Sequence, residues 1–110
     1  MTETSAFKPI KLSGRLDTAK VGEIETRFYA EVGAIKTPGA VALIDLSEVD
    51  FLSSLGIRLL VTAGKTLKQR QVKLGVIAPA SEGVMQALEI SGLPELFSFF
   101  ESEEAARAAL

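Results

Sequence analysis

The fold is decided by residues 40–60, where an apolar run, a polar loop and a helical pattern follow one another. The run reads Ala40-Val-Ala-Leu-Ile44, and the loop reads Asp45-Leu-Ser-Glu-Val-Asp-Phe-Leu-Ser-Ser-Leu-Gly56. A short apolar run bounded by turn residues is typical of a strand buried on both faces, and we expect it to close at Asp45. A helix should follow and reach Arg70 or Gln71, with an inner face made of Ile57, Leu60, Val61, Gly64 and Leu67.

The same alternation continues on both sides of this stretch. Before it, a strand over residues 7–16 leads to Asp17, a helix-capping residue, and then to a helix over 18–31 with apolar residues at steps of three and four. After it come a strand over 72–78, a helix capped at Ser81, a short strand over 97–100 and an Ala-rich helix over 102–110. Strands that alternate with helices need crossover connections. The sequence therefore predicts one α/β domain over residues 1–110, with a small, mostly parallel or mixed sheet and about four helices.

Composition excludes many kinds of chemistry. The chain has 110 residues, 47% of them hydrophobic and 24% charged, which suits a single well-buried core. It contains no Cys, His or Trp, so it cannot form a Ser-His-Asp centre, a zinc finger or a disulfide. The net charge of −2 disfavours nucleic acid as a ligand. We expect no metal, no cofactor, no membrane insertion and a cytoplasmic location.

Two candidate sites have ordinary explanations. Asp17, Asp45 and Asp50 would converge if each followed a strand, and paired carboxylates can bind a metal or perform acid-base chemistry. No nucleophile accompanies them, so a small enzyme acting through Asp17 and Asp45 is the least favoured hypothesis. Residues 64–66 read Gly-Lys-Thr, as at the end of a phosphate-binding loop, but Leu59 stands where that motif needs Gly, and the tripeptide lies in a helical pattern.

The pair Ser53-Ser54 is a stronger candidate. It lies immediately before an apolar helix, where free backbone N–H groups point. One interpretation is that one serine simply caps the helix. The other is that an exposed serine here accepts a phosphoryl group from another protein, which would confront a docked partner with new charge.

Two segments then resemble a known family. They are Leu12-Ser-Gly-Arg-Leu-Asp-Thr-Ala19 and Ile44-Asp-Leu-Ser-Glu-Val-Asp-Phe-Leu-Ser-Ser-Leu-Gly56, supported by residues 74–77 and 84–97. In their order and residue types these segments resemble the STAS domain, and more closely its stand-alone anti-sigma factor antagonist branch. The resemblance implies a non-enzymatic switch protein that binds an anti-sigma factor serine kinase of histidine-kinase-like ATPase fold, is released when that kinase phosphorylates it, and is reset by a phosphatase. Matched residue by residue, the phospho-acceptor is Ser54, and the partner-binding positions are Asp17, Asp45, Ser53, Ser54, Leu55 and Gly56.

This chain departs from the family pattern at three places. Ser53 replaces the motif Asp, and Leu55 replaces a second hydroxyl residue. These changes leave open an alternative, a constitutive STAS interaction subunit of a transporter or signalling assembly without phosphorylation. Few residues precede Leu12, so the first edge strand is expected to be short or missing, and an exposed sheet edge would allow weak pairing with a second copy.

Overall fold

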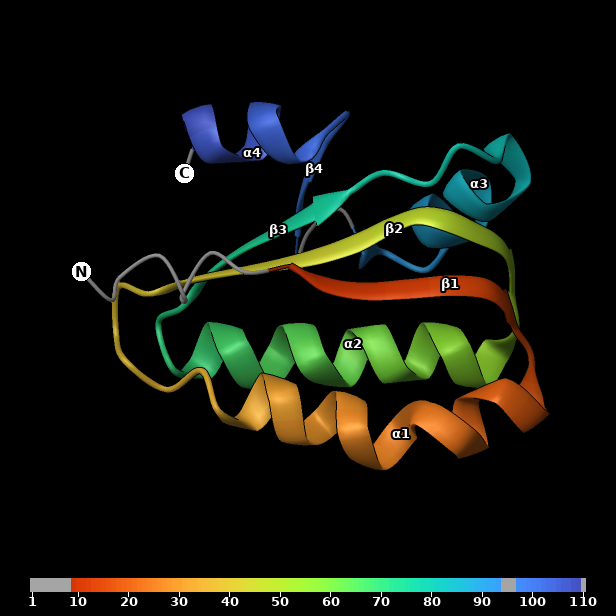
Figure 1. Cartoon of the computed structure of the whole chain (residues 1–110), viewed down its shortest axis with the longest axis horizontal. Coiled ribbons are helices and arrows are strands. Elements are labelled where there is room, and N and C mark those ends of the chain that lie inside the picture. The colour runs from red at the N-terminus through yellow and green to blue at the C-terminus, as the bar shows by residue number, and fades with distance from the viewer. Residues whose placement is uncertain (1–8, 94–96, 110) are drawn as a thin grey trace.

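The computed structural model describes residues 9–93 and 97–109, in which four strands and four helices alternate along the chain (Figure 1). The strands are β1 (Ile10–Leu16), β2 (Val41–Leu52), β3 (Lys73–Ile77) and β4 (Ser98–Phe100). The helices are α1 (Thr18–Gly33), α2 (Ser54–Gln69), α3 (Glu82–Ile90) and α4 (Glu103–Ala109). The sheet order is β1-β2-β3-β4, and each pairing is parallel. The predicted α/β class is confirmed.

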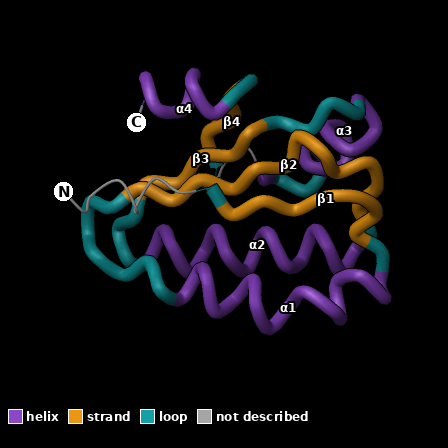
Figure 2. Tube along the Cα trace, viewed as in Figure 1, coloured by secondary structure: helices purple, strands orange, loops and turns teal. Residues whose placement is uncertain are grey.

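Two layers of helices enclose the sheet. Helices α1 and α2 lie side by side along one face, and α3 and α4 lie on the other (Figures 1 and 2). The main core forms where the apolar faces of the helices meet the sheet, and Phe28 is its largest fully buried side chain. A smaller cluster of Leu43, Ile77 and Ala106 lies under α4. Residues 64–66 lie inside α2, so they do not form a phosphate-binding loop.

Strand β2 is longer than predicted. The expectation that it closes at Asp45 is wrong, because it continues to Leu52 along β1. The pairing shifts twice, between Lys11 and Ser13 and between Gly14 and Arg15, and each time β2 contains one extra residue. Each extra residue in a bulge changes which of the following side chains face the core. The buried positions after Asp45 are consequently spaced three apart, at Leu46, Val49 and Leu52.

The first strand is an edge of the sheet within the part of the chain that the structure describes, because β1 pairs with β2 alone. Residues 7 and 8, which the sequence assigned to this strand, lie outside the described residues. Pairing of this edge with a second copy stays a prediction.

A backbone position that favours glycine lies just beyond the end of α2. Gln71 has a φ of +62°, and its N–H donates to the carbonyl of Lys68 at 3.0 Å. A side chain in this left-handed region costs about 1 to 2 kcal/mol, which is why glycine usually follows a helix.

We therefore expect Gln71→Gly to raise the free energy of unfolding by about 0.5 to 1 kcal/mol, after the greater flexibility of glycine in the unfolded chain is subtracted. Chemical denaturation would measure this, with Gln71→Ala as the control that keeps a Cβ and should gain nothing. Equal stabilities for the glycine and alanine variants would contradict the strain argument.

Candidate functional site

The carboxyl ends of β1 and β2 meet through Ser53. Its backbone N–H donates to the carbonyl of Leu16 at 3.0 Å, and its Oγ donates to the same carbonyl at 2.7 Å. The Oγ also accepts the N–H of Gly56 at 3.2 Å, which caps α2. Next to Leu16, Asp17 caps α1 by accepting the N–H of Lys20 at 2.9 Å, as the sequence predicted. Both helices therefore begin at one edge of the sheet.

The two serines have different environments. Ser53 is half-buried and holds β1, β2 and α2 together through the bonds just described. Ser54 is exposed and is the first residue of α2. Within the described residues its hydroxyl has no hydrogen-bond partner. The capping interpretation therefore applies to Ser53, and the hydroxyl available for chemistry from outside is that of Ser54.

Gly56 brings α2 close to the sheet. It is buried, and a Cβ added to it would lie 2.8 Å from Cδ1 of Leu52 and 3.2 Å from the carbonyl oxygen of Leu16. These distances are shorter than van der Waals contact, so a larger residue would displace the start of α2. The absence of a side chain at Gly56 therefore lets α2 begin close to β1, and this sets the positions of Ser53 and Ser54.

Two large apolar side chains within three residues of Ser54 in the sequence are exposed. Phe51 and Leu55 are 38% and 39% exposed, which is unusual for side chains of their size in this protein. The guanidinium carbon of Arg15 lies 4.2 Å from the centre of the Phe51 ring, and its Nε lies 4.0 Å from Oδ2 of Asp17. We call Asp17, Ser54 and Leu55, which lie where α1 and α2 begin, the Ser54 surface. An apolar surface edged by charge is typical of protein interfaces.

Asp45 lies away from this surface. It is in the middle of β2, pairs with Lys11 on one side and Ile77 on the other, and its Oδ1 accepts the N–H of Ser47 at 2.9 Å. At strand rise, the seven residues to Leu52 correspond to about 20 Å. The prediction that Asp45 ends its strand beside Asp17 is therefore wrong.

Among residues 9–93 and 97–109, no three acidic side chains gather as a metal site would need. Close to Asp45, Lys11 and Glu48 form an ion pair in which Nζ and Oε2 lie 2.9 Å apart. The hydrogen bond to Glu48 and its negative charge raise the pKa of Lys11. Both side chains of this ion pair are exposed, and their opposite charges cancel.

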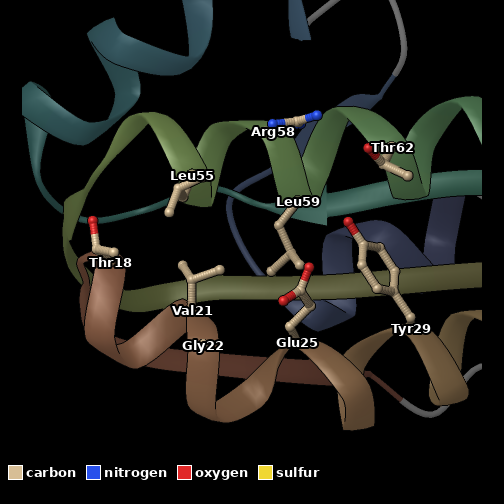
Figure 3. A pocket seen from close by; sticks show the side chains of 9 residues that line it. All are labelled: Thr18, Val21, Gly22, Glu25, Tyr29, Leu55, Arg58, Leu59 and Thr62. Atoms are coloured by element: carbon tan, nitrogen blue, oxygen red, sulfur yellow. The ribbon is translucent and has the colours of Figure 1, made fainter.

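A groove of about 580 Å³ runs between α1 and α2 (Figure 3). Val21 and Leu59 are buried in its floor, while Glu25 from α1 and Arg58 from α2 supply opposite charges to its walls. Leu55 belongs to both the groove and the Ser54 surface, so the two are continuous. The complete lining is Thr18, Val21, Gly22, Glu25, Tyr29, Leu55, Arg58, Leu59 and Thr62. Sequence reasoning missed this groove.

None of the helices within the described parts of the chain combines the length and apolar character that crossing a bilayer requires.

The chain is similar to known proteins in both sequence and fold. The STAS domain matches residues 1–106. BtrV of Bordetella bronchiseptica, a proposed anti-sigma factor antagonist, is 35% identical over 98 residues, which cover 89% of this chain and 81% of that protein. An anti-sigma-B factor antagonist of Listeria monocytogenes is 33% identical over 87 residues, or 79% of this chain and 73% of that protein. The crystal structure of an anti-sigma factor antagonist from Mycobacterium paratuberculosis superposes with a TM-score of 0.74 at 25% identity, covering 91% of this chain and 82% of that one.

Proposed function

The chain belongs to the STAS domain family, and on that premise we propose that it is an anti-sigma factor antagonist controlled by phosphorylation of Ser54. The unphosphorylated protein binds an anti-sigma factor that is also a serine kinase, in the cytoplasm where ATP is available. Phosphorylation releases it, and a phosphatase restores the binding form. The protein itself is a regulatory binding module and not an enzyme.

The observation that carries the proposal is the exposed hydroxyl of Ser54 at the start of α2, which has no hydrogen-bond partner among the described residues and stands next to the exposed Leu55. A kinase can reach this oxygen without displacing any hydrogen bond that the described residues form. The neighbouring replacement of the family's Asp by Ser53 is compatible with the same local structure, because Ser and Asp are similarly good helix caps. Ser53 retains this capping role through Gly56.

The switch is an electrostatic change at an apolar interface. Transfer of the γ-phosphoryl group of ATP to Oγ of Ser54 forms a phosphoester and ADP, and the hydroxyl proton passes to the kinase. The product carries about −1.5 to −2 charges. The start of α2 tolerates negative charge because its N–H groups point there. A partner packed over Leu55 and the start of α2 would have to desolvate the phosphate, so binding weakens.

We expect the cognate anti-sigma factor kinase and ATP to add one phosphoryl group to the wild type and none to Ser54→Ala, as measured by intact mass. Ser53→Ala is the matched control, because it removes the adjacent hydroxyl and leaves Ser54 in place. It should still gain one phosphoryl group. A phosphate on Ser54→Ala, or none on the wild type, would exclude Ser54 as the acceptor.

The same proteins test release. In a calorimetric titration against the kinase without ATP, Ser54→Ala should bind like the wild type and Ser54→Asp at least about tenfold more weakly, a loss of about 1.4 kcal/mol. Equal affinities for the alanine and aspartate variants would contradict a switch. If, in addition, the kinase adds no phosphate to the wild type, the protein would instead be a constitutive interaction subunit. The presence of Leu55 where the family has a hydroxyl residue is compatible with that alternative.

A further inference from the structure

Arg58 lies one helical turn beyond Ser54 on α2. Side chains four residues apart on a helix are neighbours, with Cβ atoms about 5 to 6 Å apart. Arg58 is exposed and forms part of the groove wall together with Leu55 (Figure 3). Its guanidinium is therefore within reach of a group attached to Ser54 after rotation of its own side chain.

Arg58 is also available. In the part of the chain that the structure describes, it forms no ion pair. Glu25 lines the same groove from α1 but is not paired with it. Arg15, near the end of β1, already contacts the Phe51 ring and Asp17. Arg58 is thus the cation that a new anion at Ser54 would attract first.

We propose that Arg58 binds the phosphate on Ser54 and so transmits phosphorylation to the groove between α1 and α2, an inference that rests on the proposed function. A guanidinium presents two parallel N–H donors to phosphate oxygens. An acidic group four residues before a basic one is the favourable order on a helix. The phosphate attracts Arg58 more strongly than Glu25 does, because it carries up to twice the charge of a carboxylate.

The consequence is a change in the groove itself. In the unphosphorylated protein Glu25 and Arg58 give opposite charges to its two walls. When Arg58 turns to the phosphate, Glu25 is left as the charged residue of the lining, and the groove becomes acidic. Phosphorylation then alters the groove, about one helical turn away from the modified atom, as well as the surface at Ser54.

The test uses protein synthesised with phosphoserine at position 54, so that no kinase is needed, and follows the phosphate by phosphorus NMR during a pH titration. A nearby guanidinium stabilises the dianion, so the phosphate pKa should be lower in wild type than in Arg58→Gln, by about 0.3 to 0.7 units. Glu25 and Asp17 raise the phosphate pKa in both proteins alike, and Arg15 lowers it in both. Arg58→Lys should restore part of the difference, since it keeps the charge and loses the paired donors.

The matched control is Arg27→Gln, which removes one positive charge from an exposed position on α1 outside this groove. It should leave the phosphate pKa within about 0.1 unit of wild type, because charges beyond the Debye length are screened. Equal pKa values in wild type and Arg58→Gln, or the same rise in Arg27→Gln, would overturn the proposal. Failure of a kinase to modify Ser54 would instead overturn the proposed function and leave this measurement unaffected.

Discussion

Gly56→Val should lower the free energy of unfolding by about 3 kcal/mol, near the upper end of the cost of overpacking a well-filled core. The added Cβ would lie 2.8 Å from Cδ1 of Leu52, which can move, and 3.2 Å from the backbone oxygen of Leu16, which cannot move without disturbing β1. The Leu16 oxygen also accepts both bonds from Ser53. The substitution therefore strains the junction that holds the start of α2. A domain of this size is stable by about 5 to 15 kcal/mol, so the loss is large.

The comparison for Gly56 is Gly22→Val in α1, where an added Cβ meets nothing within 4 Å. Helix propensity affects both variants in the same direction, and steric crowding affects only one. Denaturant titration of the two variants should show a difference of about 3 kcal/mol. If both glycines accept valine equally well, the close approach of α2 to β1 has no energetic importance.

Phe28→Ala should cost about 3 to 5 kcal/mol, because it leaves a cavity in the main core. Phe28 is 1% exposed, and its ring lies 5.8 Å from that of Tyr29.

A second apolar side chain provides the reference for Phe28. Ile90 is 87% exposed at the end of α3, so Ile90→Ala should change stability by no more than about 0.5 kcal/mol. Thermal and chemical unfolding of both variants would measure the contrast. A loss below about 1 kcal/mol for Phe28→Ala would mean that the core around α1 collapses to fill the space.

Local patterns were sufficient to predict the order of the elements. The apolar spacing of α1 and α2, the capping residues Asp17 and Ser81, and the buried run before Asp45 each act within a few residues of the chain. The length of β2 could not be predicted in the same way. Its bulges replace strand alternation with a spacing of three, and they follow from the register with β1, which is distant in sequence.

The candidate site, too, could be predicted only where it depends on local sequence. The sequence predicts that one of Ser53 and Ser54 caps α2 and that an exposed serine could be modified. Whether Ser53 or Ser54 is the cap depends on the carbonyl of Leu16, which binds Ser53 and lies 37 residues from it in the chain. The groove requires Glu25 and Arg58 to be brought together from two helices, and no local pattern indicates that pairing.

The attachment of Ser53 to Leu16 has a consequence for enzyme specificity. Many kinases bind their substrates as extended peptides. In this protein, however, Ser54 is the first residue of a helix, and the preceding residue, Ser53, is held to β1 by two hydrogen bonds to the carbonyl of Leu16. An enzyme acting on Ser54 would thus meet a rigid three-dimensional epitope assembled from β1, β2 and α2. A short synthetic peptide with the sequence of residues 48–62 would lack that epitope, and the folded domain would be the true substrate.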